Sequence, residues 1–176
     1  MVIAVQFVFI LGGIKLTKED YQNVMVAVDG SKTSEVAFKK AVDIVKRNNG
    51  KLYITHIVDT RTLQVFPQYD RPMNSSDFLT QQADAATSTL NKYKEWAEER
   101  DVSDIFVIIK HGSPRTELAD ILPEEYDINL LILGATGLNA IERAFVGSVS
   151  QYVVRNAPCD ILIVRTDDSV DSEPIV

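Results

Sequence analysis

The stretch that decides the fold is LLILGATGLNAIERAFVGSVSQYVVRNAPCDILIVR, from Leu130 to Arg165. It begins and ends with short apolar runs, LLIL and ILIV, which are typical of strands buried on both faces. Between them, Val149, Tyr152 and Val153 recur at helical spacing, and Pro158 ends the segment. A strand, a helix and a second strand in this order predict a parallel β-α-β unit.

The same alternation runs back through the chain from Asn23. Apolar runs predict strands over residues 24–28, 52–58, 104–110, 128–134 and 160–165. Three- and four-residue apolar spacing predicts helices after Ser31, from about Leu79 to Ala97, from about Arg115 to Leu122, and from Ser148 to Asn156. Nearly all-apolar strands separated by helices predict a doubly wound α/β domain, with an open parallel sheet covered on both faces.

Composition limits the functions that fit this domain. A chain of 176 residues with 45% hydrophobic side chains is long enough for one globular domain. A net charge of −7 argues against nucleic acid or an anionic membrane as partner, because both would be repelled. The single cysteine, Cys159, excludes an internal disulfide and fits a cytoplasmic protein. We expect it to be a buried structural thiol.

Residues 1–22 form an apolar extension ahead of the domain. Val2 to Ile14 is apolar except for Gln6, but thirteen residues are too few to cross about 30 Å of hydrocarbon as a helix. The segment also has no basic region or small-residue cleavage site. We expect an extra strand packed on the body or on a partner, or an appendage outside the domain. An export or membrane signal is the alternative. The acidic tail, residues 167–176, is expected to be frayed.

Gly134, Gly137, Gly147 and Ser148 follow the strand at 128–134. In open parallel sheets, ligands bind beyond the carboxyl ends of the strands. The glycines permit unusual φ angles or a close approach of backbone to ligand, and they also occur as plain turn formers. Gly147 and Ser148 open a helix, where free amides and the helix dipole favour phosphate. Ser148 is predicted both to cap that helix and to donate to a phosphate oxygen.

Arg143 is the cation of this stretch, and it either reaches phosphate or remains solvated. The stretch is neither GxxxxGK[ST] nor GxGxxG. Without the lysine of the first motif, rapid phosphoryl transfer is not expected.

The pattern Gly134-x2-Gly137-x9-Gly147-Ser148, followed by a helix, APCD and ILIVR, resembles the nucleotide-binding motif of the universal stress proteins. The opening segment NVMVAVDGS and the segment ITHIVD match the same family. The resemblance covers residues 23–165, so the domain is placed at residues 23–166. It implies a Rossmann-like sheet, similar to that of the adenine nucleotide alpha hydrolases, with strand order 3-2-1-4-5. It also implies a homodimer through Asp160 to Arg165 and bound ATP.

The resemblance also assigns cofactor-binding residues. Ala27, Val28 and Asp29 match the segment that contacts the nucleoside, and Ile57, with Val58 beside it, matches the adenine position. Asp29 either accepts a hydrogen bond from the nucleoside or caps the Asp-Gly-Ser turn. The ribose and phosphate cradle matches Leu133, Gly134, Gly137, Gly147, Ser148, Val149 and Ser150. Ala135 and Thr136 depart from the family pattern, which puts one phosphate contact in question.

Two histidines and a possible magnesium ion complete the candidates. His56 is expected to be a packed, hydrogen-bonded imidazole, and the role of His111 is left open. Their spacing predicts no metal site in the protein itself. Any magnesium would arrive with the phosphates.

Three functions fit this sequence. The first is an ATP-binding regulatory module of the stress response, a homodimer with no catalytic residue assigned and no or very slow hydrolysis. The second is a weak ATPase or autokinase, for which Glu142 and Asp29 are candidates by proximity alone. The third is a protein-interaction dimer that binds no nucleotide, against which the intact glycine motif argues.

Overall fold

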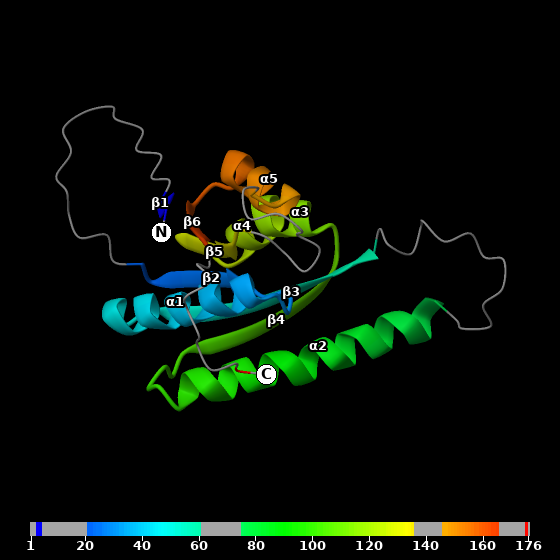
Figure 1. The fold of residues 1–176 in the computed structure, drawn as a ribbon, viewed down its shortest axis with the longest axis horizontal. Helices are drawn as coiled ribbons and strands as arrows, with labels where there is room; N and C mark the ends of the chain where they lie inside the picture. The colour runs from blue at the N-terminus through cyan, green and yellow to red at the C-terminus, as the bar shows by residue number, and fades with distance from the viewer. Residues whose placement is uncertain (1–2, 5–20, 61–74, 136–145, 166–174, 176) are drawn as a thin grey trace.

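The structure is a computed structural model that describes residues 3–4, 21–60, 75–135, 146–165 and 175. These residues form a sheet with helices on both of its faces (Figure 1). Two hydrophobic clusters, one on each face, fill the space between the sheet and the helices. This arrangement confirms the predicted doubly wound α/β class.

The sheet has six strands in the order β1-β6-β5-β2-β3-β4. Their bounds are β1 Ile3–Ala4, β2 Asn23–Ala27, β3 Lys51–Asp59, β4 Ile105–Gly112, β5 Leu130–Gly134 and β6 Asp160–Val164. The strands β2 to β6 pair in parallel, and β1 pairs antiparallel with β6. The five parallel strands therefore have the predicted order 3-2-1-4-5, and β1 extends the sheet by one short strand.

The helices divide between the two faces of the sheet. Their bounds are α1 Lys32–Asn48, α2 Ser75–Glu98, α3 Pro114–Thr116, the π-helical turn η2 Glu117–Ile121, α4 Leu122–Glu125 and α5 Ser148–Asn156. The cluster under α1 and α2 contains alternate strand residues such as Val24, Val26 and Ile54. The residues between them, such as Met25 and Tyr53, pack under α4 and α5. This period of two is what strands buried on both faces require.

Helix α1 lies along β2 and β5 and buries one apolar face. Phe38 and Ala41 are fully buried in it. The helix ends at Asn49, which takes the left-handed conformation with φ 50°, so Asn49 rather than the following glycine provides the left-handed C-cap. Gly50 has a different role, because a Cβ there would lie 2.6 Å from the backbone oxygen of Tyr21.

The carboxyl-terminal half of α2 packs on the sheet. Leu90, Tyr93 and Ala97 are buried there, and burial raises the pKa of Tyr93 to about 12. Trp96 is half-buried, with its ring 5.6 Å from that of Phe38 and the Arg100 guanidinium 3.4 Å from its centroid. Tyr93 and Trp96 are therefore packing residues of this helix.

The two ends of the chain contact the body at different places. Ile3 and Ala4 form β1 on the edge of the sheet, which is the extra strand that the sequence offered as one expectation for the extension. In the tail that was expected to be frayed, Ile175 is partly buried against the cluster under α1 and α2. Among the described residues, no helix is long and apolar enough to cross a bilayer.

Candidate functional site

The candidate site lies at the carboxyl edge of β2 and β5, which are neighbours in the sheet. The chain leaves β2 into α1 on one face and reaches α5 on the other face after β5 (Figure 1). Such a divergence opens a crevice at the edge of an open parallel sheet. The first turns of α1 and α5 are thus placed around the same point.

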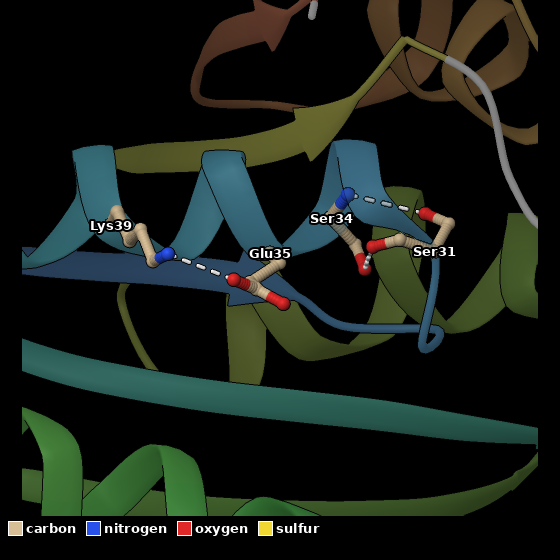
Figure 2. Close-up of polar contacts among 4 residues, drawn as sticks. All are labelled: Ser31, Ser34, Glu35 and Lys39. Atoms are coloured by element: carbon tan, nitrogen blue, oxygen red, sulfur yellow. Dashed lines mark hydrogen bonds and ion pairs between the residues drawn. The ribbon is translucent and has the colours of Figure 1, made fainter. Parts of the chain in front are cut away.

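The first turn of α1 is closed by its own side chains (Figure 2). The Ser34 amide donates to Ser31 Oγ at 3.1 Å, and Ser34 Oγ donates to the Ser31 carbonyl at 2.8 Å. One turn further on, Lys39 Nζ bonds to Glu35 Oε1 at 2.8 Å. Because Ser31 caps the helix, this end leaves less unpaired amide for an anion.

Asp29 has the turn-capping role that the sequence allowed for it. The Ser31 amide donates to Asp29 Oδ1 at 3.0 Å, and Gly30 between them has φ 84°. Asp29 itself is exposed. The carboxylate therefore fixes the Asp-Gly-Ser turn while it faces solvent beside the crevice.

The first turn of α5 is built differently. Its N-cap is Gly147, with φ −58° and ψ 155°, and no side chain of the described residues makes a capping hydrogen bond there. The prediction that Ser148 is the N-cap is wrong. The Gln151 amide donates to the Gly147 carbonyl at 2.9 Å, so Ser148 is already inside the helix. Its side chain is exposed, and the amides of the first turn have no partner within the helix.

Ser150 fixes this turn to the sheet. It is 5% exposed, and its Oγ donates to the Gly134 carbonyl at 2.9 Å. The Gly147 amide donates to the Ala135 carbonyl at 2.6 Å. These two hydrogen bonds anchor the first turn of α5 to the end of β5. The Ser150 hydroxyl is already used for this contact.

Gly134 has a packing role at the end of β5. A Cβ there would lie 2.8 Å from Thr33 Oγ1 and 3.0 Å from the Ser34 amide nitrogen. Gly30 is the glycine with positive φ among the described residues, so Gly134 does not supply the unusual φ that was one expected reason for it. It permits a close approach, but to the first turn of α1.

The predicted nucleoside residues divide by face. Ala27 and Ile57 are half-buried, and both pack beside the cluster under α4 and α5. Val28 lies in the opposite cluster at 3% exposure, Val58 is buried at 2% exposure, and Leu133 is buried in the cluster under α4 and α5. Ala27 and Ile57 therefore offer side-chain surface near the crevice, and the other three support it from within the core.

His56 joins β3 to the end of β2. Its Nδ1 lies 2.7 Å from the Val28 carbonyl oxygen, and because that oxygen only accepts, Nδ1 carries the proton. The expectation of a packed, hydrogen-bonded imidazole is confirmed. His111 is exposed near the end of β4.

Thr55 is a buried polar residue that sequence reasoning missed. It is fully buried, and its Oγ1 has no hydrogen-bond partner among the described residues. Thr55 is the register partner of Ala27 and lies two residues before Ile57, so the three share one face of the sheet. A polar residue inside the apolar run LYITHIV was the available signal, but the missing partner is visible only in three dimensions.

The remaining candidates are Cys159, three residues of the glycine-rich stretch and the possible metal ligands. Burial raises the pKa of the Cys159 thiol to about 11, which fits the predicted structural thiol. Gly137, Glu142 and Arg143 lie outside the described residues. Within the described part of the chain, no group of three His, Cys, Asp or Glu side chains is arranged to hold a metal ion.

The fold and this edge define a doubly wound α/β domain with two helix starts at the carboxyl edge of β2 and β5. Residues 20–165 match the model of the universal stress protein family, and the chain belongs to that family. A Staphylococcus aureus strain USA300 protein that carries the universal stress protein name is 41% identical over 157 residues, which are 89% of this chain and 92% of the relative.

Solved structures agree with this assignment. Universal stress protein UspA from Lactobacillus plantarum has a TM-score of 0.72 and 29% identity, covering 84% of this chain and 100% of its own. A universal stress protein in complex with cAMP has a TM-score of 0.61 and 28% identity, covering 85% of this chain and 100% of its own.

Proposed function

We propose that this chain binds ATP at the carboxyl edge of β2 and β5, with the phosphates at the first turn of α5. The observation that carries the proposal is that, within the described part of the chain, α5 begins without a side-chain cap while Ser148, its first residue, is exposed. A helix start of this kind binds anions through its amides and dipole. The net charge of −7 makes such local donors necessary.

The phosphate site uses backbone more than side chains. The amides of Ser148, Val149 and Ser150 point out of the first turn, and the Ser148 hydroxyl adds a donor. The Ser150 hydroxyl is excluded from this set because it holds the Gly134 carbonyl. The resemblance adds Gly137 to the cradle, and Arg143 is proposed as the cation that reaches the phosphates. Magnesium would bind with the phosphates, since it prefers phosphate oxygens and water to a cage of protein ligands.

The nucleoside would lie against Ala27 and Ile57. Both are apolar and half-buried on one face of the sheet, and a base placed there would bury apolar surface that is now partly exposed. Asp29 uses Oδ1 for the Ser31 amide and is exposed, so its carboxylate is suited to a ribose hydroxyl. A relative in complex with cAMP supports an adenine nucleotide.

In this proposal the nucleotide acts as a regulatory ligand of a cytoplasmic homodimer, and no catalytic residue is assigned. Binding alone shifts stability, because a ligand at 100 times its Kd stabilises the folded state by about 2.7 kcal/mol. The dimer is placed at Asp160 to Arg165, the outer strand of the parallel sheet.

The proposal is tested by nucleotide release and by thermal shift. The purified protein is denatured and the supernatant chromatographed, and the refolded or nucleotide-free protein is melted with millimolar ATP-Mg or cAMP. We expect released adenine nucleotide or a concentration-dependent rise in Tm, and loss of both in Gly137→Val at an unchanged Tm without ligand. A protein that releases no nucleotide and shows no shift would contradict the proposal.

A further inference from the structure

The outer edge of β6 can be worked out from its bonds to β5. The Asp160 amide donates to the Asn129 carbonyl at 3.2 Å, and the Ala135 amide donates to the Val164 carbonyl at 2.7 Å. Asp160 and Val164 therefore direct these backbone groups toward β5. Because alternate residues of a strand direct their backbone groups to opposite sides, Ile161 and Ile163 present theirs to the outer edge.

β1 occupies part of this edge. Ile3 lies opposite Ile163 and Ala4 lies opposite Leu162 in antiparallel register. Since Ile163 faces outward, Ile3 and Ile163 form the pair that exchanges both backbone hydrogen bonds. Leu162 faces β5 with its backbone groups, so the amide of Ala4 points away from β6. Ile3 of β1 thus hydrogen-bonds to the backbone amide and carbonyl of Ile163 that face the outer edge.

The same edge is complementary to itself. An antiparallel pairing of two β6 strands about a two-fold axis at Leu162 would place Ile161 of one copy opposite Ile163 of the other. Both residues face outward, so both pairs would exchange two hydrogen bonds. The central side chains, Ile161, Leu162 and Ile163, are apolar, and Ile161 and Leu162 are half-buried. This edge therefore fits a second copy of the chain.

The two pairings exclude each other, because each uses the outward amide and carbonyl of Ile163. We propose that β1 competes with a second copy for the edge of β6, so that the first residues of the chain set its self-association. Release of β1 frees the edge and favours the dimer, and retention of β1 keeps the chain monomeric. The inference rests on the homodimer in the proposed function and is independent of the nucleotide site.

A disulfide lock tests the competition directly. Ala4 and Leu162 form the closely spaced pair, with Cα atoms about 4.5 Å apart, within the range for a disulfide. Full-length Ala4→Cys/Leu162→Cys in a Cys159→Ser background is compared with itself, oxidised and reduced, by analytical ultracentrifugation. We expect a cross-link within one chain, a monomer at all concentrations when oxidised, and self-association when reduced. An oxidised protein that dimerises like the reduced one would overturn the inference.

Two proline variants supply a matched pair in the full chain. Ile3→Pro removes the amide that faces Ile163, whereas Ala4→Pro removes one that points away from β6. We expect the dimer Kd of Ile3→Pro to be at least tenfold lower than that of the wild type, and that of Ala4→Pro to be within threefold of it. Equal association of the two variants would overturn the inference.

The outcomes also separate this inference from the proposed function. Equal dimerisation by wild-type, locked and proline variants would retain a dimer but remove β1 as its competitor. Monomers throughout would remove the dimer and the inference together. ATP binding, measured on the same samples, bears on the nucleotide site alone.

Discussion

Two helices begin at the same edge of the sheet, and only one of them is closed by its own residues. At α1, Ser31 caps the first turn and Ser34 returns a hydrogen bond to it. At α5, Gly147 stands at the cap position, and no side chain that the structure describes caps the turn. The difference separates a structural helix start from one suited to an anion, although both have the same dipole.

Gly134 is what holds the two starts together. Its missing side chain lets the first turn of α1 approach β5, and its carbonyl accepts the Ser150 hydroxyl of α5. The capped start of α1 (the closed start) and the uncapped start of α5 (the open start) therefore both contact Gly134. Substitutions around it are expected to separate stability from ligand binding.

The largest effect is expected from Gly134→Val, which forces the shared contact apart. Its Cβ would meet the Ser34 backbone nitrogen at 3.0 Å, and backbone cannot rotate away as a side chain can. We expect a loss of about 1–3 kcal/mol in the free energy of unfolding, the cost typical of overpacking. Urea denaturation followed by circular dichroism measures it. Unchanged stability would show that the two starts are not held in close contact by this residue.

Ser148→Asp should affect binding and leave the fold intact. A carboxylate in the first turn of a helix favours the dipole, so stability should not fall, but it would repel phosphate at the open start. We expect the Kd for ATP to rise at least tenfold, or about 1.4 kcal/mol, as measured by isothermal titration calorimetry. Ser148→Asn is the neutral control and should bind ATP more tightly than the aspartate. Equal affinities in the two variants would argue against phosphate at α5.

Ser31→Ala should have the opposite result. Loss of the cap at α1 should cost about 1 kcal/mol of stability, with the Kd for ATP unchanged, because this start is not assigned to the ligand. Thermal and urea unfolding give the stability, and titration gives the Kd. The matched variant Ser148→Ala should change stability by less than about 0.5 kcal/mol, the range usual for surface sites. Equal losses of stability in the two variants would remove the distinction between the starts.

The smallest effect is expected from Thr55→Val, beneath the nucleoside wall. It replaces a fully buried hydroxyl that has no partner within the described part of the chain by a methyl group of the same shape. Because such a hydroxyl costs about 1–3 kcal/mol to bury, the variant should be as stable as the wild type or up to about 1 kcal/mol more stable. Urea denaturation is the measurement. Destabilisation would mean that the hydroxyl has a partner, such as a buried water.

The sequence predicted the elements well, because their signals are local. Apolar runs placed the five parallel strands, and the helix from Ser148 to Asn156 has the predicted bounds. The exact cap of α5 was missed, since Gly and Ser are both accepted at that position. Whether Gly147 or Ser148 takes the N-cap position depends on the Ala135 carbonyl, which accepts a hydrogen bond from the Gly147 amide.

Long-range packing was less accessible from the sequence. Gly134 was assigned to turn geometry or ligand contact, and its closeness to Thr33 depends on residues 101 positions apart in the chain. The pairing of Ile3 with Ile163 has the same origin. The apolar extension indicated a strand but contained no signal for its partner. Gly137 was assigned by resemblance and Arg143 by its charge, and both assignments stay predictions.

The central claim is that the open start of α5 holds the phosphates of an adenine nucleotide. The most direct measurement is a calorimetric titration of nucleotide-free wild-type protein with ATP-Mg, alongside Ser31→Ala and Ser148→Asp. The account predicts saturable binding of one ATP per chain in the wild type and in Ser31→Ala, with binding at least tenfold weaker in Ser148→Asp. No binding by the wild type at millimolar ATP, or full binding by Ser148→Asp, would contradict it.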